Sequence, residues 1–222
     1  MDQLALDLGH RPALNREDFL VAPCNEAAVA WIDRWPDWPA PALALSGPAR
    51  AGKSHLARIW QAKAGARALP PEALVSDRLP ELLGNARAAL VDRADTAAEE
   101  PLLHLYNLLA ERGGHLLIVA REPPSRWAIK LADLRSRLVA SPTVAVALPD
   151  EDLLGALLVK LFSDRQLSVA REVLAYLVLH LERSFAAADA AVTALDRAAL
   201  AERRKITVPL ARRILSLDQE EA

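Results

Sequence analysis

The 222-residue sequence has one cysteine, five histidines and no long apolar run, and each scarcity argues against a class of function. Cys24 alone cannot build a disulfide framework or a multi-cysteine zinc site. The histidines show no H-x-x-x-H or H-E-x-x-H spacing, which disfavours metal-dependent hydrolysis. No apolar stretch approaches the roughly 18 residues of a membrane span, and the acidic start Met1-Asp2 is unlike a signal peptide. We therefore expect a soluble, cytoplasmic protein without a membrane segment.

The charge balance removes further classes. The chain has 27 basic and 29 acidic residues, whereas an autonomous nucleic-acid binder needs a basic excess to neutralise phosphates. Apolar residues make up 52%, which is too high a share for a disordered chain. The length suits one large domain or two small ones. We expect a folded protein without sequence-specific DNA binding of its own.

The apolar pattern changes near residue 149, where we expect a domain boundary. Before it, four short buried runs alternate with helical patterns, which is typical of a parallel α/β sheet covered by helices. These runs are 42–45, 88–91, 115–120 and 143–148. After it, the 3.6-residue period continues without a strand, which predicts a C-terminal all-α subdomain placed as a lid. The predicted parts are a flexible 1–12, an α/β subdomain 13–149 and a helical lid 150–222.

Residues 47–54 carry the strongest motif. Gly47-Pro48-Ala49-Arg50-Ala51-Gly52-Lys53-Ser54 fits the P-loop pattern G-x-x-x-x-G-K-[ST], between a predicted strand and a predicted helix. Its glycines let backbone N–H groups point at phosphate oxygens, at the positive end of the helix dipole. Lys53 would reach the β- and γ-phosphates and Ser54 would ligate Mg²⁺. His55 adjoins the loop as a packed helix residue rather than a catalytic base. The motif predicts bound ADP or ATP with Mg²⁺.

Asp92 is the predicted second metal ligand, because it follows the apolar run 88–91. A hydrolytic P-loop enzyme would carry a carboxylate at the next position, which here is Arg93. Arginine cannot accept a hydrogen bond from the attacking water. Asp95, three residues on, is a poor geometric substitute. We expect nucleotide binding without efficient ATP hydrolysis by the chain alone.

Together these residues resemble the AAA+ module of the bacterial replication initiator DnaA and, more closely, its regulatory relatives of the Hda type. The resemblance covers nearly the whole chain and implies a P-loop AAA+ fold. Asp18-Phe19-Leu20-Val21 is similar to the element that frames the adenine, which implies that Phe19, Leu20 and Val21 lie near the base. The run 116–119 followed by Pro123-Pro124 resembles the sensor 1 region. This sequence departs there, because Ala120 and Arg121 stand where a polar sensor residue is usual.

The resemblance also gives roles to two arginines. Leu134-Arg135-Ser136-Arg137-Leu138 resembles the family's L-x-S-R-[LF] segment, which implies that Arg137 is an arginine finger acting on a neighbouring subunit's γ-phosphate. The pattern alone also allows a helix-surface arginine paired with Asp133. The segment 181–185 resembles the sensor 2 region, which implies that Arg183 contacts the phosphates. By itself Arg183 could equally be an exposed arginine at a helix start.

The first residues resemble the sliding-clamp-binding motif Q-L-x-L-x-L of Hda proteins. Gln3 would hydrogen-bond at the rim of an apolar groove that Leu4, Leu6 and Leu8 fill. Alternating leucines also describe an edge strand. The chain ends on the acidic stretch 218–221, so we expect no helix-turn-helix domain after the lid.

The resemblance implies a DnaA-related adaptor that binds adenine nucleotide and the DNA polymerase sliding clamp and stimulates ATP hydrolysis by DnaA. It would thereby negatively regulate the initiation of chromosomal replication, associated with the nucleoid through the clamp. Self-association as a homodimer stays open, as does the choice between ADP and ATP. We favour a core position for Trp31, Trp35 and Trp38.

Three other classes remain open. A self-sufficient AAA+ ATPase, such as a helicase loader or transposition-helper protein, would need the acid that Arg93 replaces. A small-molecule P-loop kinase would need a basic acceptor site in its lid. A DNA-binding initiator fragment is disfavoured by the charge.

Overall fold

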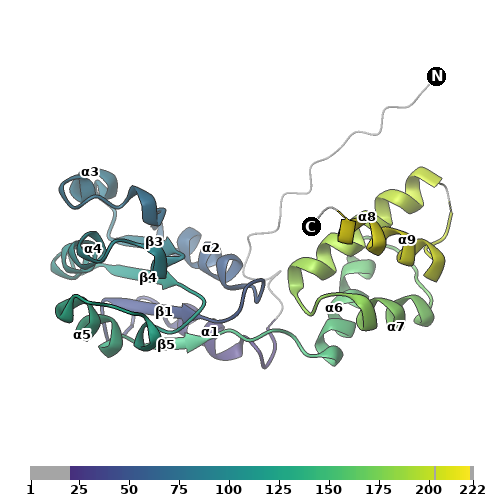
Figure 1. Cartoon of the computed structure of the whole chain (residues 1–222), viewed down its shortest axis with the longest axis horizontal. Coiled ribbons are helices and arrows are strands. Elements are labelled where there is room, and N and C mark those ends of the chain that lie inside the picture. Colours follow the sequence, from purple (N-terminus) through teal and green to yellow (C-terminus); the bar gives the residue numbers. More distant parts are fainter. Residues whose placement is uncertain (1–20, 203, 221–222) are drawn as a thin grey trace, which may run out of the picture.

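A computed structural model describes residues 21–202 and 204–220 of the chain. The predicted clamp-binding residues Gln3, Leu4, Leu6 and Leu8 lie outside the described residues, as do Phe19 and Leu20. Figure 1 shows the described chain as a sheet flanked by helices, followed by a group of four helices.

Within the described residues, five parallel strands form one sheet (Figure 1). In spatial order they are β2 (Arg67–Ala68), β3 (Ala88–Asp92), β4 (His115–Val119), β1 (Ala42–Ser46) and β5 (Thr143–Ala145). Val119 is in register with both Leu45 and Asp92, so the carboxyl ends of the three central strands meet at one edge. Ligands of open parallel sheets bind at that edge.

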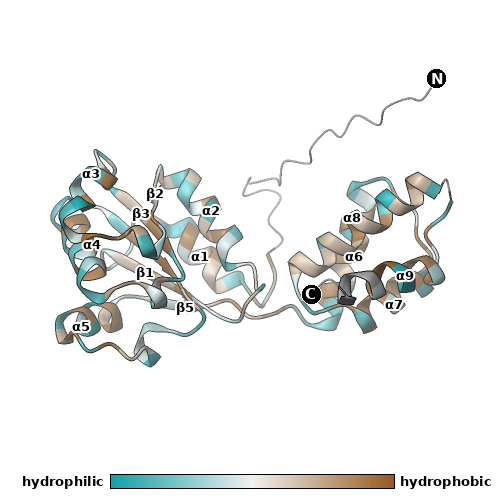
Figure 2. Ribbon diagram, turned by 45° about the horizontal axis from the view of Figure 1, so that its top comes forward, coloured by the Kyte–Doolittle hydropathy of each residue, from teal (hydrophilic) through white to brown (hydrophobic). Residues whose placement is uncertain are grey.

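Two apolar layers sandwich the sheet, because successive side chains of a strand point to opposite faces. The covering helices are α1 (Glu26–Arg34), α2 (Lys53–Ala64), α3 (Leu79–Leu83), α4 (Glu99–Glu111) and α5 (Ala132–Ala140). In β1, Ala42 and Ala44 pack with α3, α4 and α5, whereas Leu43 and Leu45 pack with α1 and α2. Figure 2 shows the hydrophobic strands between these helices. The predicted parallel α/β fold is confirmed.

Four of the five tryptophans gather at the amino-terminal edge of the sheet, opposite the edge where ligands of such sheets bind, whereas Trp127 packs on the other face. Trp38 stacks on the fully buried Trp60 at 5.5 Å between ring centroids, and its Nε1 donates a 2.8 Å hydrogen bond to the carbonyl of Trp31. Trp35 meets Trp60 edge-on at 6.3 Å. His115, the first residue of β4, lies edge-on to Trp38 at 5.4 Å. The expected core position holds for Trp38, which is buried, whereas Trp31 and Trp35 are partly buried and pack against that core.

The segment after β5 is all-helical, as predicted for the lid. Its helices are α6 (Glu151–Asp164), α7 (Arg171–His180), α8 (Phe185–Glu202) and α9 (Val208–Glu220). Asp150 caps α6 by accepting a 2.8 Å hydrogen bond from the backbone N–H of Leu153. The four helices enclose an apolar core of their own around Phe162 and Leu195.

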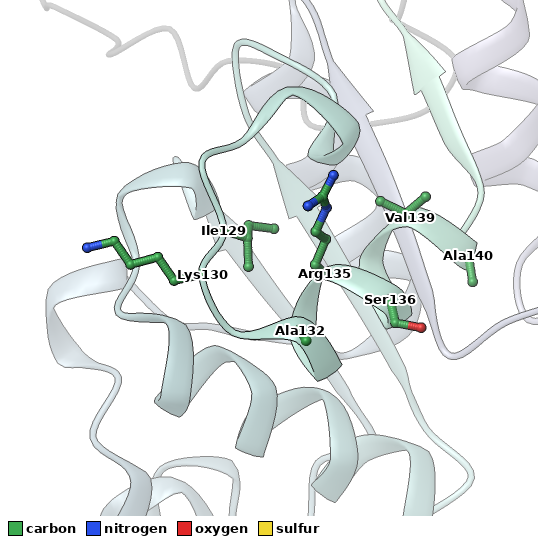
Figure 3. A pocket seen from close by; sticks show the side chains of 7 residues that line it. All are labelled: Ile129, Lys130, Ala132, Arg135, Ser136, Val139 and Ala140. Atoms are coloured by element: carbon green, nitrogen blue, oxygen red, sulfur yellow. The ribbon is translucent and has the colours of Figure 1, made fainter.

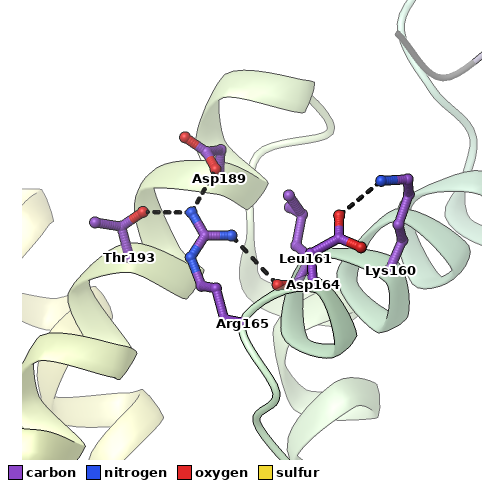
Figure 4. Close-up of polar contacts among 6 residues, drawn as sticks. All are labelled: Lys160, Leu161, Asp164, Arg165, Asp189 and Thr193. Atoms are coloured by element: carbon purple, nitrogen blue, oxygen red, sulfur yellow. Dashed lines mark hydrogen bonds and ion pairs between the residues drawn. The ribbon is translucent and has the colours of Figure 1, made fainter. Parts of the chain in front are cut away.

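Arg165 joins the end of α6 to α8 (Figure 4). Its Nη2 donates to the carboxylate of Asp189 at 2.9 Å and to the hydroxyl of Thr193 at 3.0 Å. Its Nη1 donates to the carbonyl of Leu161 at 3.2 Å. The Arg165 side chain is only 13% exposed, so these bonds link two lid helices within the structure.

Among the described helices, none has both the length and the apolar character that a membrane span requires.

Candidate nucleotide-binding site

The P-loop connects β1 to α2 at the carboxyl edge of the sheet, where the sequence predicts it. Gly47 has φ +144°, and a Cβ there would lie 2.0 Å from the carbonyl oxygen of Val146, so only glycine fits. The backbone N–H of Gly47 donates a 2.9 Å hydrogen bond to the carbonyl of Arg121, just beyond β4. Gly52, with φ +91°, turns the chain into α2. The loop is therefore anchored to two strands.

Lys53 lies inside the loop. Its ammonium group donates to the carbonyls of Gly47 and Pro48 at 2.8 and 2.6 Å, and the residue is 8% exposed. Burial lowers the pKa of Lys53 below its ordinary value of 10.5, and the charge of Asp92 opposes that shift. Because loop carbonyls are weak partners for a cation, phosphate oxygens at the same place would bind it more strongly.

The two predicted magnesium ligands meet directly. The hydroxyl of Ser54 donates a 2.7 Å hydrogen bond to Oδ2 of Asp92, and Oδ1 of Asp92 accepts from the N–H of Arg93 at 2.9 Å. A hydroxyl and a carboxylate are oxygen ligands that suit Mg²⁺. The described residues hold no cluster of three or more His, Cys, Asp or Glu that could hold a metal ion. A metal at Ser54 and Asp92 would therefore need nucleotide phosphates to complete its coordination.

The position after Asp92 supplies no carboxylate to this site. Arg93 adopts φ +56°, and its guanidinium pairs with Glu72 at 3.7 Å, with both side chains 69% exposed. The chain then makes a 3₁₀ turn, Ala94–Thr96, in which the N–H of Thr96 donates to the carbonyl of Arg93 at 2.9 Å. Arg93 is thus ion-paired with Glu72, outside the P-loop.

Asp95 lies in the 3₁₀ turn Ala94–Thr96 that follows Arg93. Its negative charge opposes the lowering of the pKa of Lys53, which burial causes. Arg93, at φ +56°, begins this turn in the left-handed region. A left-handed arginine leaves no sequence signal, so the turn could not be predicted.

The sensor 1 position carries no polar side chain toward the site. Ala120 is 5% exposed, and its N–H continues the ladder to the carbonyl of Leu45 at 3.0 Å. Arg121 follows, and its charge also lowers the pKa of Lys53. The arginine therefore adds a second cation near Lys53.

The lid contacts the P-loop through Glu182, which sequence reasoning did not single out. The carboxylate of Glu182 accepts a hydrogen bond from Nη1 of Arg50, the loop residue with φ +62°. The ring of Phe185 lies 3.8 Å from where a Cβ of Gly52 would be. Arg183, the predicted sensor 2 residue, is instead bonded to Glu151 of the lid. In this conformation the lid offers the phosphate site an acid rather than its arginine.

Of the remaining predicted residues that the structure describes, His55 directly follows the loop in sequence. His55 lies in the first turn of α2, and its Nε2 is buried. Val21, at the start of the described chain, is 42% exposed. The segment after it is tied to the sheet, because the N–H of Ala147 donates to the carbonyl of Cys24 at 2.8 Å.

Arg137 belongs to a different place. It lies on α5, which covers the sheet face opposite to the P-loop helix α2. Its Nε donates to Oδ1 of Asp133 at 3.0 Å, and its guanidinium carbon lies 5.7 Å from the ring centroid of Tyr106 on α4. The ion pair with Asp133 that the sequence allowed is present.

A hollow lies between α5 and the segment just before it (Figure 3). The hollow measures about 470 Å³ and is lined by Ile129, Lys130, Ala132, Arg135, Ser136, Val139 and Ala140. Neither Asp133 nor Arg137 is among the residues that line it. The hollow is therefore separate from both the nucleotide site and Arg137.

Known proteins share this architecture. Residues 150–215 match the family model of the Hda lid domain. Domain III of the replication initiation protein DnaA from Thermotoga maritima is similar, with TM-score 0.75 and 18% identity over 92% of this chain and 96% of that one. DnaA from Aquifex aeolicus bound to AMPPCP gives TM-score 0.69 and 14% identity over 81% and 64%. The RuvB branch migration motor of Thermotoga maritima gives 0.70 and 12% over 91% and 71%.

The structural likenesses share the AAA+ fold, and the lid match adds a sequence relationship to one member of that group. The resemblance to DnaA and Hda is supported by the lid match in sequence and by the shared fold. The chain has an AAA+ fold like that of domain III of DnaA, and its residues 150–215 form a lid domain of the Hda type.

Proposed function

We propose that this protein is an adaptor that binds an adenine nucleotide and the DNA polymerase sliding clamp, and stimulates ATP hydrolysis by DnaA. Its output would be the negative regulation of chromosomal replication initiation in the cytoplasm. One observation carries the proposal: a well-formed P-loop stands beside positions that lack the usual hydrolytic groups. These positions are Arg93, ion-paired with Glu72, and Ala120, which is buried.

Nucleotide binding is supported by the loop geometry. Lys53 is buried among carbonyls that phosphate oxygens would replace, and Ser54 and Asp92 already meet at 2.7 Å. Bound Mg²⁺ would neutralise phosphate charge at these two ligands. The similar DnaA of Aquifex aeolicus holds AMPPCP, which supports an adenine nucleotide here.

The proposed action on DnaA rests on Arg137. The residue lies on the sheet face away from α2, so its cation is separated from this chain's own P-loop by the sheet. An arginine supplied in trans can accelerate nucleotide hydrolysis by about 10³–10⁵-fold. DnaA would contribute the nucleotide, metal and water-positioning groups, and this chain one positive charge.

The proposed tether to the clamp rests on Gln3, Leu4, Leu6 and Leu8. An extended peptide that anchors the protein to a clamp on DNA raises its concentration near that DNA without any new contact to DnaA. The acidic net charge of −2 agrees with recruitment through a protein rather than through DNA itself.

The test is ATP turnover measured with this protein alone, with DnaA, and with DnaA plus DNA-loaded clamp. We expect low turnover alone and clamp-dependent acceleration of DnaA hydrolysis. Arg137→Ala should abolish the acceleration while nucleotide and clamp binding remain. Normal acceleration by that variant would refute the proposal. Replacing Gln3 and Leu6 by Ala should remove clamp binding without lowering thermal stability.

A self-sufficient AAA+ ATPase is the second candidate, and Asp95 is the observation in its favour. Its carboxylate reaches Lys53 electrostatically and could serve as the second acid that Arg93 denies. Rapid turnover by the protein alone, lost in Asp95→Asn, would establish this alternative.

A further inference from the structure

Arg137 is held at three points, by one residue of α4, one of α5 and the residue directly after α5. Oδ1 of Asp133 accepts from Nε at 3.0 Å, and the Tyr106 ring lies beneath the guanidinium at 5.7 Å. The carbonyl of Arg137 accepts from the hydroxyl of Ser141 at 2.8 Å and from its N–H at 3.1 Å. Tyr106 is 6% exposed and Ser141 is 5% exposed, so both lie on rigid, buried structure.

These contacts use only one edge of the guanidinium. Asp133 takes the Nε hydrogen, and within the described part of the chain neither terminal nitrogen of Arg137 donates a hydrogen bond. The terminal nitrogens form the part of the guanidinium that binds two phosphate oxygens side by side. With 39% of its side chain exposed, Arg137 can present these nitrogens to another molecule while Nε stays bonded.

We propose that Asp133 and Tyr106 are positioning residues that hold the Arg137 guanidinium in the orientation in which it meets the partner's terminal phosphate. This inference rests on the function proposed above. A free arginine side chain samples many rotamers, and ordering it during catalysis would cost free energy. Asp133 fixes the direction in which the two terminal nitrogens of Arg137 point. The Tyr106 ring supports the face of the guanidinium through a cation–π contact.

The ion pair between Asp133 and Arg137 contributes little to the stability of the fold. Its removal can therefore be tested without unfolding the protein. The pair joins residues four apart on one helix, with side chains 39% and 53% exposed, and such exposed pairs contribute little to stability. An effect of Asp133 on hydrolysis would therefore not follow from unfolding. The matched control is Asp164→Ala, which breaks an equally spaced pair with Lys160 at 2.6 Å in the lid.

The experiment measures single-turnover hydrolysis of ATP on DnaA, with DNA-loaded clamp and increasing concentrations of each full-length variant. We expect Asp133→Ala to lower the maximal rate roughly tenfold, with the half-saturating concentration unchanged. Asp133→Asn keeps an acceptor for Nε and should retain most of the rate. Tyr106→Phe should keep the rate, whereas Tyr106→Leu should lose it. Asp164→Ala should match the unaltered protein.

The outcomes distinguish the positioning role of Asp133 and Tyr106 from the proposed stimulation of DnaA on which it rests. If Arg137→Ala loses stimulation but Asp133→Ala keeps the full rate, the positioning role is wrong and the proposed function stands. A faster rate for Asp133→Ala would mean that the pair sequesters the arginine, which also overturns the inference. Normal stimulation by Arg137→Ala would overturn both. If Tyr106→Leu proves unstable by thermal unfolding, the two Asp133 variants decide.

Discussion

The hydroxyl of Ser54, in the first turn of α2, donates a 2.7 Å hydrogen bond to the carboxylate of Asp92 at the end of β3. Two segments 38 residues apart in sequence thus bring a hydroxyl and a carboxylate together, which are oxygen groups that suit Mg²⁺. The parallel register of β1, β4 and β3 fixes this approach, because their carboxyl ends reach the same edge. A metal bridge between protein and phosphate could form here with little backbone movement.

Removing either oxygen ligand should therefore weaken nucleotide binding only when Mg²⁺ is present. We expect Ser54→Ala and Asp92→Asn to lower affinity for ATP roughly tenfold in Mg²⁺, because the cation loses a ligand. In EDTA the variants should bind like the unaltered protein, or more tightly for Asp92→Asn, which removes a negative charge near the phosphates. Titration with a fluorescent ATP analogue measures both conditions. Equal losses with and without Mg²⁺ would contradict a metal role.

The prediction for Gly47 concerns the fold of the loop itself. A Cβ at residue 47 would lie 2.0 Å from the carbonyl oxygen of Val146, at a φ of +144°. Gly47→Ala should shift the loop, lower the free energy of unfolding by about 1–3 kcal/mol and remove nucleotide binding. Gly65→Ala is the control, because Gly65 also has positive φ but nothing within 4 Å of the added Cβ. Denaturant unfolding and nucleotide titration compare the two, and an undisturbed Gly47→Ala protein would contradict the loop geometry.

The overall fold could be predicted because its signals are local and strong. Apolar runs indicated the three central strands and the edge strand β5, and the P-loop pattern indicated the turn between Ser46 and Lys53. The edge strand β2 was missed, since Arg67 and Ala68 are both exposed and form no apolar run. The strand expected at 143–148 is shorter, although Val146 still donates to the carbonyl of Ser46 at 2.8 Å.

The position of a site residue could be predicted only where a single short motif determines it. Lys53 and Ser54 take their places from the P-loop itself. The contact between Arg50 and Glu182 joins segments 132 residues apart, and no pattern in either segment reveals it. Arg183 stands beside Glu182 in sequence, yet it bonds to Glu151. Which of two neighbouring charged residues faces the loop depends on the turn into α8, which three-dimensional packing determines.

That contact leads to a prediction about the lid. The carboxylate of Glu182 pairs with Arg50 of the P-loop, and its negative charge therefore lies where the phosphates of a bound nucleotide would be. Glu182→Gln should raise affinity for ATP about twofold to fivefold, because the repulsion is removed and Arg50 becomes available to phosphate. Glu151→Gln should have a similar effect by a different route, since it frees Arg183. Fluorescent nucleotide titration measures both, with Asp164→Ala as the control, and weaker binding of Glu182→Gln would contradict the prediction.

The pKa of His115 leads to a prediction about how stability depends on pH, and this prediction does not involve nucleotide binding. Burial against the tryptophans lowers its pKa below the ordinary value of 6.5, and a hydrogen bond with the Pro36 backbone opposes part of that shift. Below pH 6.5 the unfolded chain therefore takes up a proton that the folded protein resists, so this contribution to stability is present above pH 6.5. It is lost as pH falls from 6.5 to the lowered pKa of the folded state.

His115→Phe keeps an aromatic ring beside Trp38 and removes the titrating group. Its free energy of unfolding should fall less between pH 7.5 and pH 5 than that of the unaltered protein, because the carboxylates contribute equally to both chains. The difference should be no larger than about 1.36 kcal/mol for each unit of pKa shift. Urea unfolding across this pH range, followed by tryptophan fluorescence, gives both curves. Parallel curves would show that His115 titrates alike in the folded and unfolded states, and that the tryptophan cluster does not resist its protonation.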